Sequence, residues 1–171
     1  MSIVSNHVAS EVISSLIGGA QLDTIRIYSL VVQLGFVRLD AAEGWPNEIW
    51  VSVSGNLDVG GSFAADWDSK SAGDLFVRRA KALGSAYLLI GKRVTAVRVS
   101  ESGALQMELE DSGLRADAGE DASLEEVWAV MSDTPDVSAD HRWYVALDDS
   151  GVLSARAGPD SVGHSTFLRA E

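Results

Sequence analysis

Apolar residues near the N-terminus recur at four-residue spacing, at Val8, Val12 and Leu16. This spacing places them on one side of a helix, so the pattern predicts a helix over residues 6–16. Ser5 or Asn6 is suited to cap the first turn. Gly18 is expected to end the helix in the left-handed conformation that favours glycine.

Most of the remaining sequence alternates between apolar and polar residues, which is typical of strands with one buried face. The strands predicted in this way cover residues 22–28, 30–39, 49–54, 57–59, 94–100, 104–110, 114–116, 143–147 and 152–156. A second helix is predicted over residues 71–89. Gly84 weakens the middle of that helix by up to about 1 kcal/mol relative to alanine.

Three triplets share the same chemistry, an acidic residue followed by serine and glycine. They are Glu101-Ser102-Gly103, Asp111-Ser112-Gly113 and Asp149-Ser150-Gly151. Glycine supplies the positive φ that tight turns need, and serine or aspartate can bond the local backbone. We therefore interpret these triplets as turns between strands rather than as ligand sites.

The chain also contains an internal repeat. Its matching segments are Leu16-Ile17-Gly18 with Glu48-Ile49-Trp50, and Leu89-Ile90-Gly91 with Glu126-Val127-Trp128. Trp50 follows Gly18 by 32 residues, and Trp128 follows Gly91 by 37. Each unit has an apolar face to bury, most economically against its twin. The predicted fold class is α+β and strand-rich, with a duplicated helix-then-antiparallel-sheet unit about a pseudo-twofold axis.

The repeat divides the chain into a first unit, residues 1–66, and a second unit, residues 67–171, which adds a C-terminal hairpin and tail. We expect one compact domain, because 171 residues with 46% hydrophobic content can bury a core without metal or disulfide staples. Cysteine is absent, which excludes disulfides, thiolate metal sites and cysteine nucleophiles. No signal peptide or membrane span is recognisable, so we expect a cytoplasmic protein.

The negative charge is concentrated in one part of the chain. Residues 1–100 carry nine acidic and nine basic side chains, whereas residues 101–171 carry sixteen acidic and four basic. The second part thus accounts for the whole formal net charge of −12. Such a surface repels nucleic acid and anionic lipid and attracts a cationic partner. Simple solubility is the alternative explanation.

Familiar motifs for phosphate and calcium do not fit this sequence. Six residues separate Gly84 from Gly91 where a phosphate loop needs four, and Arg93 stands where serine or threonine is required. A calcium loop beginning at Asp66 fails, because Lys70 and Ser71 replace an oxygen ligand and a glycine.

Other catalytic patterns are equally absent from the sequence. The three histidines, His7, His141 and His164, have no second histidine at metal spacing, and no serine lies in a nucleophile elbow. Neighbouring carboxylates such as Glu125-Glu126 are expected to point to opposite faces of a strand, which makes them poor acid–base partners. We therefore predict no catalytic residue, metal or cofactor.

The tryptophans divide into two groups. Trp50 and Trp128 occupy equivalent places in the repeat, which predicts that each closes the core of its own unit. Trp45, Trp67 and Trp143 have no repeat partner. Trp143 and Tyr144, beside the acidic stretch 133–140, are candidate interface anchors, with core packing as the alternative.

Part of the chain resembles a known group of proteins. Leu89 to Val94, the Ser-Gly meander and Glu126-Val127-Trp128 followed by 143–152 resemble a family of small uncharacterised bacterial β-rich domains. They are more loosely similar to immunity proteins of polymorphic toxin systems. The similarity covers about residues 86–157. It implies a non-catalytic cytoplasmic protein that binds and blocks a co-encoded toxin, and it supplies no catalytic residue.

The leading hypothesis is therefore an immunity-type inhibitor whose acidic surface meets a basic protein, such as the substrate groove of a toxin nuclease. The expected partner-binding residues are Asp117, Glu120, Asp121, Asp133, Asp136, Asp140, Trp143 and Tyr144. A homodimeric structural or small-ligand domain is the second hypothesis. There, the basic stretch 78–98 of one copy meets the acidic stretch of another. An enzyme with a scattered site is the third.

Overall fold

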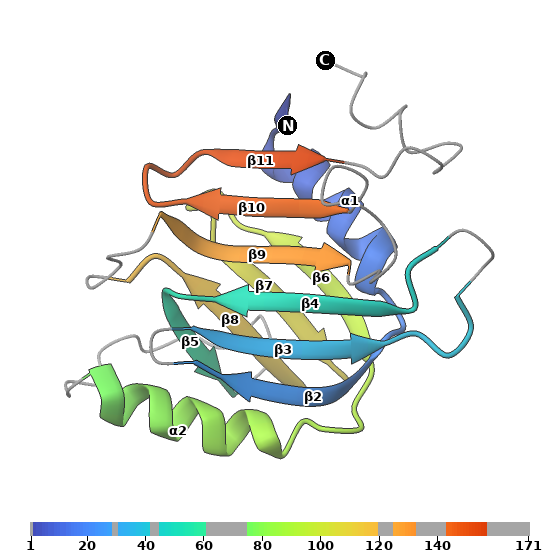
Figure 1. Ribbon diagram of the computed structural model, residues 1–171, viewed down its shortest axis with the longest axis vertical. Coiled ribbons are helices and arrows are strands. Elements are labelled where there is room, and N and C mark those ends of the chain that lie inside the picture. Colours follow the sequence, from blue (N-terminus) through green and yellow to red (C-terminus); the bar gives the residue numbers. More distant parts are fainter. Residues whose placement is uncertain are drawn as a thin grey trace.

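A computed structural model gives the fold of residues 2–28, 31–41, 45–60, 75–119, 125–132 and 143–156. Within these residues the chain forms two helices and eleven strands (Figure 1). The helices are α1 (Asn6–Ile17) and α2 (Leu75–Tyr87). The strands are β1 (Ser2–Ile3), β2 (Gln21–Ile27), β3 (Val32–Val37), β4 (Glu48–Val53), β5 (Asn56–Val59), β6 (Val94–Val99), β7 (Leu105–Leu109), β8 (Ser112–Asp117), β9 (Glu126–Ser132), β10 (Tyr144–Asp148) and β11 (Leu153–Arg156).

The strands form two antiparallel sheets that face each other. The larger sheet has the order β1-β11-β10-β9-β4-β3-β2, and the smaller has the order β5-β8-β7-β6. In Figure 1 the smaller sheet lies behind the larger one, and its strands cross the larger sheet diagonally. The chain changes sheets between β4 and β5, where the N–H groups of Ser54 and Gly55 both donate to the carbonyl of Val127 at 3.0 Å. The α+β, strand-rich class is confirmed.

Both sheets contribute to one buried core. On the larger sheet the register aligns four buried residues, Leu34, Val51, Val130 and Val145. The smaller sheet adds Leu105, Met107 and Leu114. Trp128 fills the space between them, and its indole N–H donates to the carbonyl of Gly103 at 2.9 Å. Residues from both predicted repeat units lie in this core, while the expected boundary after residue 66 lies outside the described residues.

Helix α1 begins as expected and ends one residue later than expected. Ser5 is the N-cap, and its hydroxyl accepts a hydrogen bond from Val8 N at 3.3 Å. Gly18 has φ −57°, so its expected left-handed conformation is wrong. The Gly18 N–H continues the helical bonding to Ser14 O at 2.9 Å, and Gly19, with φ +78°, makes the left-handed step instead.

Two of the three acidic-Ser-Gly turns are as expected. Gly103 and Gly151 have φ of +80° and +81°. The turn at Asp111-Ser112-Gly113 is misplaced, because Leu109 pairs directly with Ser112 and the loop consists of Glu110 and Asp111. Glu110 takes the left-handed conformation there, with φ +55°, and Gly113 lies within β8.

Trp50 and Trp128 do not have equivalent roles. Strands β4 and β9 pair with each other, and Trp50 lies opposite Met131 while Trp128 lies opposite Val53. Directly paired residues share a face of the sheet and neighbours alternate, so the two rings project from opposite faces. Trp128 enters the core, whereas Trp50 is outside the core cluster. The prediction that each tryptophan closes the core of its own unit is therefore wrong for Trp50.

Helix α1 also covers the outer edge of β6 with polar side chains. Asn6, Ser10 and Ser14 are spaced four residues apart and so lie along one side of the helix. Ser10 Oγ accepts from Val99 N at 2.7 Å, Ser14 Oγ donates to Val97 O at 3.3 Å, and Asn6 donates to Ser100 O. These bonds occupy backbone groups that an edge strand otherwise offers to another chain.

Replacing Ser10 tests this edge contact. Ser10→Ala removes the acceptor of a partly buried N–H and should destabilise the protein by about 1–2 kcal/mol. The amide of Val99 should also exchange its hydrogen faster. Ser15→Ala is the matched control, because the Ser15 hydroxyl bonds no described residue and only its backbone carbonyl accepts a bond, from Arg38. Equal unfolding midpoints for the two variants in urea would contradict the contact's contribution.

Candidate functional site

The outer face of the seven-stranded sheet is the face turned away from the four-stranded sheet. Helix α1 packs against β6, β10 and β11, and α2 packs against β5. Both helices thus close the sides of the sandwich. Among the described elements none lies over the outer face, which is turned toward the viewer in Figure 1. Within the described residues this face is therefore open to a partner.

Two rows of side chains cross the outer face from strand to strand. The register places Trp50, Met131, Tyr144 and Arg156 in one row. It places Ser52, Ala129, Ala146 and Ser154 in the next. The first row is large and the second is small, so the second row forms a low strip beside a wall of larger side chains.

Tyr144 and Glu126 meet above this low strip. Tyr144 begins β10 and Glu126 begins β9, and because the two strands are antiparallel these residues lie at opposite ends of the pair. The phenol hydroxyl of Tyr144 donates to the carboxylate of Glu126. Their side chains therefore run toward each other past Ala129 and Ala146, which are 0% and 3% exposed although they lie on an outer face. Burial, together with the bond to Glu126, raises the pKa of Tyr144 above its ordinary value.

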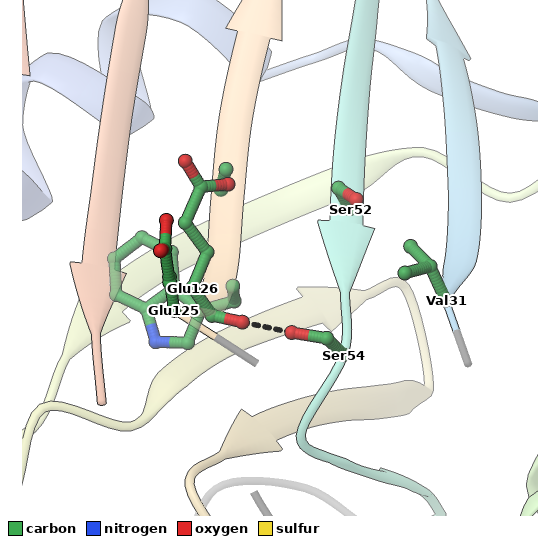
Figure 2. A pocket seen from close by; sticks show the side chains of 7 residues that line it. Val31, Ser52, Ser54, Glu125 and Glu126 are labelled. Carbon is green, nitrogen blue, oxygen red and sulfur yellow. Dashed lines mark hydrogen bonds between the residues drawn. The ribbon is translucent and has the colours of Figure 1, made fainter. Parts of the chain in front are cut away.

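A depression of about 470 Å³ lies beside this pair, at the ends of β4 and β9. Its lining consists of Val31, Ser52, Ser54, Glu125, Glu126, Trp128 and Ala129. Figure 2 shows Glu125 and Glu126 on one side of it, with Ser52, Ser54 and Val31 on the other. The hydroxyl of Ser54 donates to the backbone carbonyl of Glu126, which joins the two sides.

The two glutamates of the depression correct the sequence analysis. Glu125 and Glu126 were expected to point to opposite faces, yet both line the same depression. The reason is that β9 begins at Glu126, so Glu125 precedes the strand and does not follow its alternation. Ser52 and Ser54 were not among the candidate residues. Their alternation with Val51 and Val53 was the signal that could have placed them on the open face.

Acidic side chains gather at the end of the sandwich where this depression lies. Glu101, Glu125 and Asp149 come from three different connections between strands. Asp149 N donates to Glu125 O at 3.1 Å, and the turn that carries Glu101 is joined to β9 by the bond from the Trp128 indole to Gly103 O. No ion pair involves these three carboxylates among the described residues. Asp148 is held differently, because the hydroxyl of Ser150 and the N–H of Val152 lower the pKa of its carboxyl. We call Glu101, Glu125 and Asp149 the acidic end.

Trp50 lies in the row of large side chains on the outer face. Its ring lies across Gly35, where an added Cβ would approach the ring to 2.8 Å. The guanidinium of Arg26 covers the ring at 4.0 Å from its centroid, so Trp50 is only 4% exposed. Within the described structure its indole N–H has no hydrogen-bond partner. Trp50 is therefore a packed part of this face and not a freely exposed anchor.

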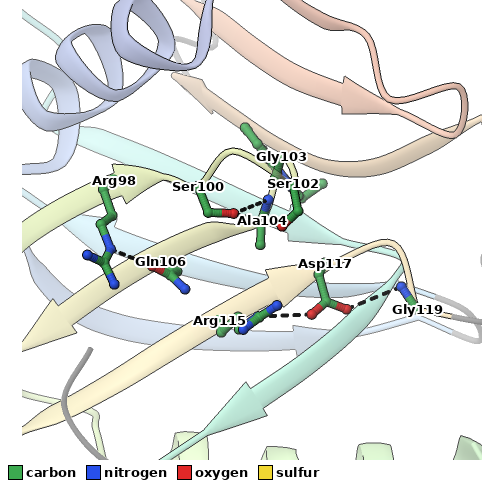
Figure 3. Close-up of polar contacts among 10 residues, drawn as sticks. Arg98, Ser100, Ser102, Gly103, Ala104, Gln106, Arg115, Asp117 and Gly119 are labelled. Atoms are coloured by element: carbon green, nitrogen blue, oxygen red, sulfur yellow. Dashed lines mark hydrogen bonds and ion pairs between the residues drawn. The ribbon is translucent and has the colours of Figure 1, made fainter. Parts of the chain in front are cut away.

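Asp117 is the one expected acidic contact residue that the structure describes. It ends β8, pairs with the guanidinium of Arg115 at 3.0 Å and accepts from Gly119 N at 3.2 Å (Figure 3). Its charge is thus largely compensated within the protein. On the same face of the smaller sheet, Arg98 donates to Gln106, which is buried although polar.

The other five expected acids, Glu120, Asp121, Asp133, Asp136 and Asp140, lie outside the described residues. Their neighbours in sequence are at two different ends of the larger sheet. Glu125 belongs to the acidic end, and Gly119 lies beside Asn56, next to the connection that bonds Val127 O, whereas Ser132 and Trp143 lie at the opposite end of β9. The described residues therefore do not join these acids into one surface.

Trp143 and Tyr144 have separate environments. Trp143 is 5% exposed and stacks on Trp45, with ring centroids 5.7 Å apart and an interplanar angle of 16°. Arg38 lies over Trp45 at 5.7 Å and donates to Ser15 O, near the end of α1, at 2.7 Å. This favours the core alternative for Trp143. Tyr144 lies on the outer face and stays a candidate contact residue.

Comparison with known proteins adds no assignment. No family model, no curated protein and no solved structure matches the chain. The resemblance to immunity proteins therefore stays a prediction. In the part of the chain that the structure describes, no helix is long and apolar enough to cross a membrane. The same part contains no group of three or more metal-ligating side chains.

The bond between Tyr144 and Glu126 predicts a coupled titration. In Glu126→Gln the pKa of Tyr144 should fall toward its ordinary value of about 10, because the negative charge that opposes phenolate formation is gone. Burial remains, so the pKa should stay somewhat elevated. Ultraviolet absorbance of tyrosinate follows the titration, with Tyr144→Phe identifying the contribution of this residue. Asp149→Asn removes the same charge without touching the phenol, and an equal shift in that variant would contradict the direct bond.

Proposed function

We propose that this chain is a non-catalytic protein-binding inhibitor of the immunity type, which neutralises a basic toxin by occupying its working surface. The observation that carries the proposal is the acidic end, where three exposed carboxylates that form no ion pair with any described residue adjoin the open face of the larger sheet. The proposal places the protein in the cytoplasm, where an inhibitor meets a toxin made in the same cell.

The charge distribution supports a cationic partner. The described carboxylates of the acidic end repel one another, and the other thirteen acids of residues 101–171 add to the negative charge. A basic protein relieves this repulsion on binding and is steered toward the surface as it approaches. Because these charges are exposed, the attraction should weaken as salt rises.

The mechanism that follows is occlusion. Lysine and arginine side chains that hold phosphate in a nuclease groove can pair instead with Glu101, Glu125 and Asp149. The outer face then supplies contact area, with Tyr144 as its half-exposed aromatic residue. No covalent bond of the partner is made or broken, so inhibition lasts as long as the complex does.

Charge reversal at the acidic end tests this function. The tagged protein is purified from its native cells at low and moderate salt, and the proteins that remain bound are identified. A stoichiometric basic protein that is lost as salt rises is the expected result. With Glu101, Glu125 and Asp149 all changed to lysine, the association rate at low salt should fall by at least about tenfold.

A matched variant changes the same number of charges elsewhere. Glu11, Asp23 and Asp40 are acids outside the acidic end, and their change to lysine alters the net charge equally. This control should retain most of the binding. Recovery of the chain alone, or equal loss in the two variants, would overturn the proposal.

A homodimer is the second candidate, and one feature favours it. Tyr87 and Leu88, at the end of α2, are 69% and 75% exposed, and Ile90 and Arg93 beside them are exposed as well. A second copy could cover this apolar and basic surface. Sedimentation equilibrium at low and high salt should then show a dimer that dissociates with salt, and a monomer at both salt concentrations would remove this candidate.

We also propose that the two repeat units arose by duplication about a pseudo-twofold axis. The segments that follow the two Leu-Ile-Gly motifs lie side by side, and Gly19 N donates to Val94 O while Val94 N donates to Ala20 O, both at 2.9 Å. The repeat-equivalent strands β4 and β9 are also antiparallel neighbours. Both contacts join equivalent parts of the two units, which supports a symmetric origin.

A further inference from the structure

We infer that the depression between β4 and β9 receives the guanidinium group of an arginine side chain from the basic partner. This inference rests on the proposed function and names the contact through which it would act. The acidic end accounts for attraction at a distance, whereas this depression provides a specific binding site for one side chain.

Acceptor atoms face the depression from two sides. The carboxylate of Glu125 and the hydroxyl of Ser52 line it, and neither has a hydrogen-bond partner within the described structure. Glu126 adds a second carboxylate, whose position is fixed by the Tyr144 hydroxyl. Figure 2 shows these groups on either side of the space between the ends of the strands. A cation placed between them gains two negative charges and a hydroxyl acceptor.

The shape favours arginine over lysine. A guanidinium is planar and carries five N–H donors in a fixed fork, so it can bond carboxylates on one side and a hydroxyl on the other at the same time. An ammonium is a compact charge that cannot span both sides equally well. Ala129 and Val31 provide apolar lining for the methylene stem of the incoming side chain.

The depression exists before any partner binds. The N–H groups of Ser54 and Gly55 each donate to Val127 O at 3.0 Å, and the Ser54 hydroxyl donates to Glu126 O. These bonds hold the end of β4 against the start of β9. Little side-chain freedom is then lost on binding, because the strands are paired and the Glu126 carboxylate is bonded.

The first test uses short blocked peptides as probes. A blocked Gly-Arg-Gly peptide is titrated into the full chain, and the backbone amide resonances are followed by nuclear magnetic resonance. Saturable shifts are expected at Ser52, Ser54 and Ala129. The corresponding Gly-Lys-Gly peptide should bind at least about threefold more weakly, since it lacks the fork of donors. Equal binding of both peptides, shifts spread evenly over all exposed acids, or no saturable shift would each overturn the inference.

Variants separate the depression from general attraction. Glu125→Gln combined with Ser52→Ala removes two acceptors and should abolish the saturable shifts. Asp149→Asn combined with Ser150→Ala removes one charge and one hydroxyl at the acidic end outside the depression, and it should leave them in place. Loss of the shifts in both double variants, or in neither, would contradict a specific arginine-binding site in the depression.

The same variants distinguish failure of this inference from failure of the proposed function. If a basic partner co-purifies equally with the wild type and with the Glu125→Gln, Ser52→Ala variant, the proposed arginine-binding site is wrong and the inhibitor function stands. If the arginine peptide binds specifically but no basic protein is recovered from the native cells, the arginine-binding site is supported and the inhibitor function is wrong.

Discussion

The pairing of β4 with β9 is the constraint on which the rest of the molecule depends. Five register pairs, from Ile49 with Ser132 to Val53 with Trp128, join two segments that are far apart in the sequence within one sheet. This register directs Val51, Val53, Val130 and Trp128 into the core and leaves Ser52 and Ala129 outside. A slip by one residue would exchange the two sets, placing serine in the core and valine on the surface. The core and the candidate site are thus two consequences of the same pairing.

The helices determine which surfaces remain open. Helix α1 fits against β6, where its apolar side enters the core and its polar stripe bonds the strand edge. Helix α2 packs at the opposite edge of the small sheet, on β5. Because both helices are needed at the edges, the outer face of the larger sheet is left for other contacts. The low strip that contains Ala129 and Ala146, and the depression at the end of that strip, both lie on that face.

Much of the fold could be predicted from local sequence. Residues 6–16 showed a helix, and the alternating runs showed most of the strands, because burial of one face imposes a period that neighbouring residues already display. Local rules failed where a distant contact decided the geometry. Gly113 was expected in a turn, but the pairing of Leu109 with Ser112 places it in a strand. Trp50 was assigned to the core by analogy with Trp128, but the register of β4 and β9 turns it outward.

The candidate site was less predictable than the fold. The sequence by itself determined most of the elements, the strand-rich class and the acidic character of residues 101–171, since these follow from local periodicity and composition; the strands at residues 2–3 and 126–132 were not among those predicted. Only the tertiary structure brought Glu101, Glu125 and Asp149 to one end, and joined Tyr144 to Glu126 across two strands. Strand pairing is a long-range choice made by the whole core, and a stretch of sequence does not carry the identity of its partner.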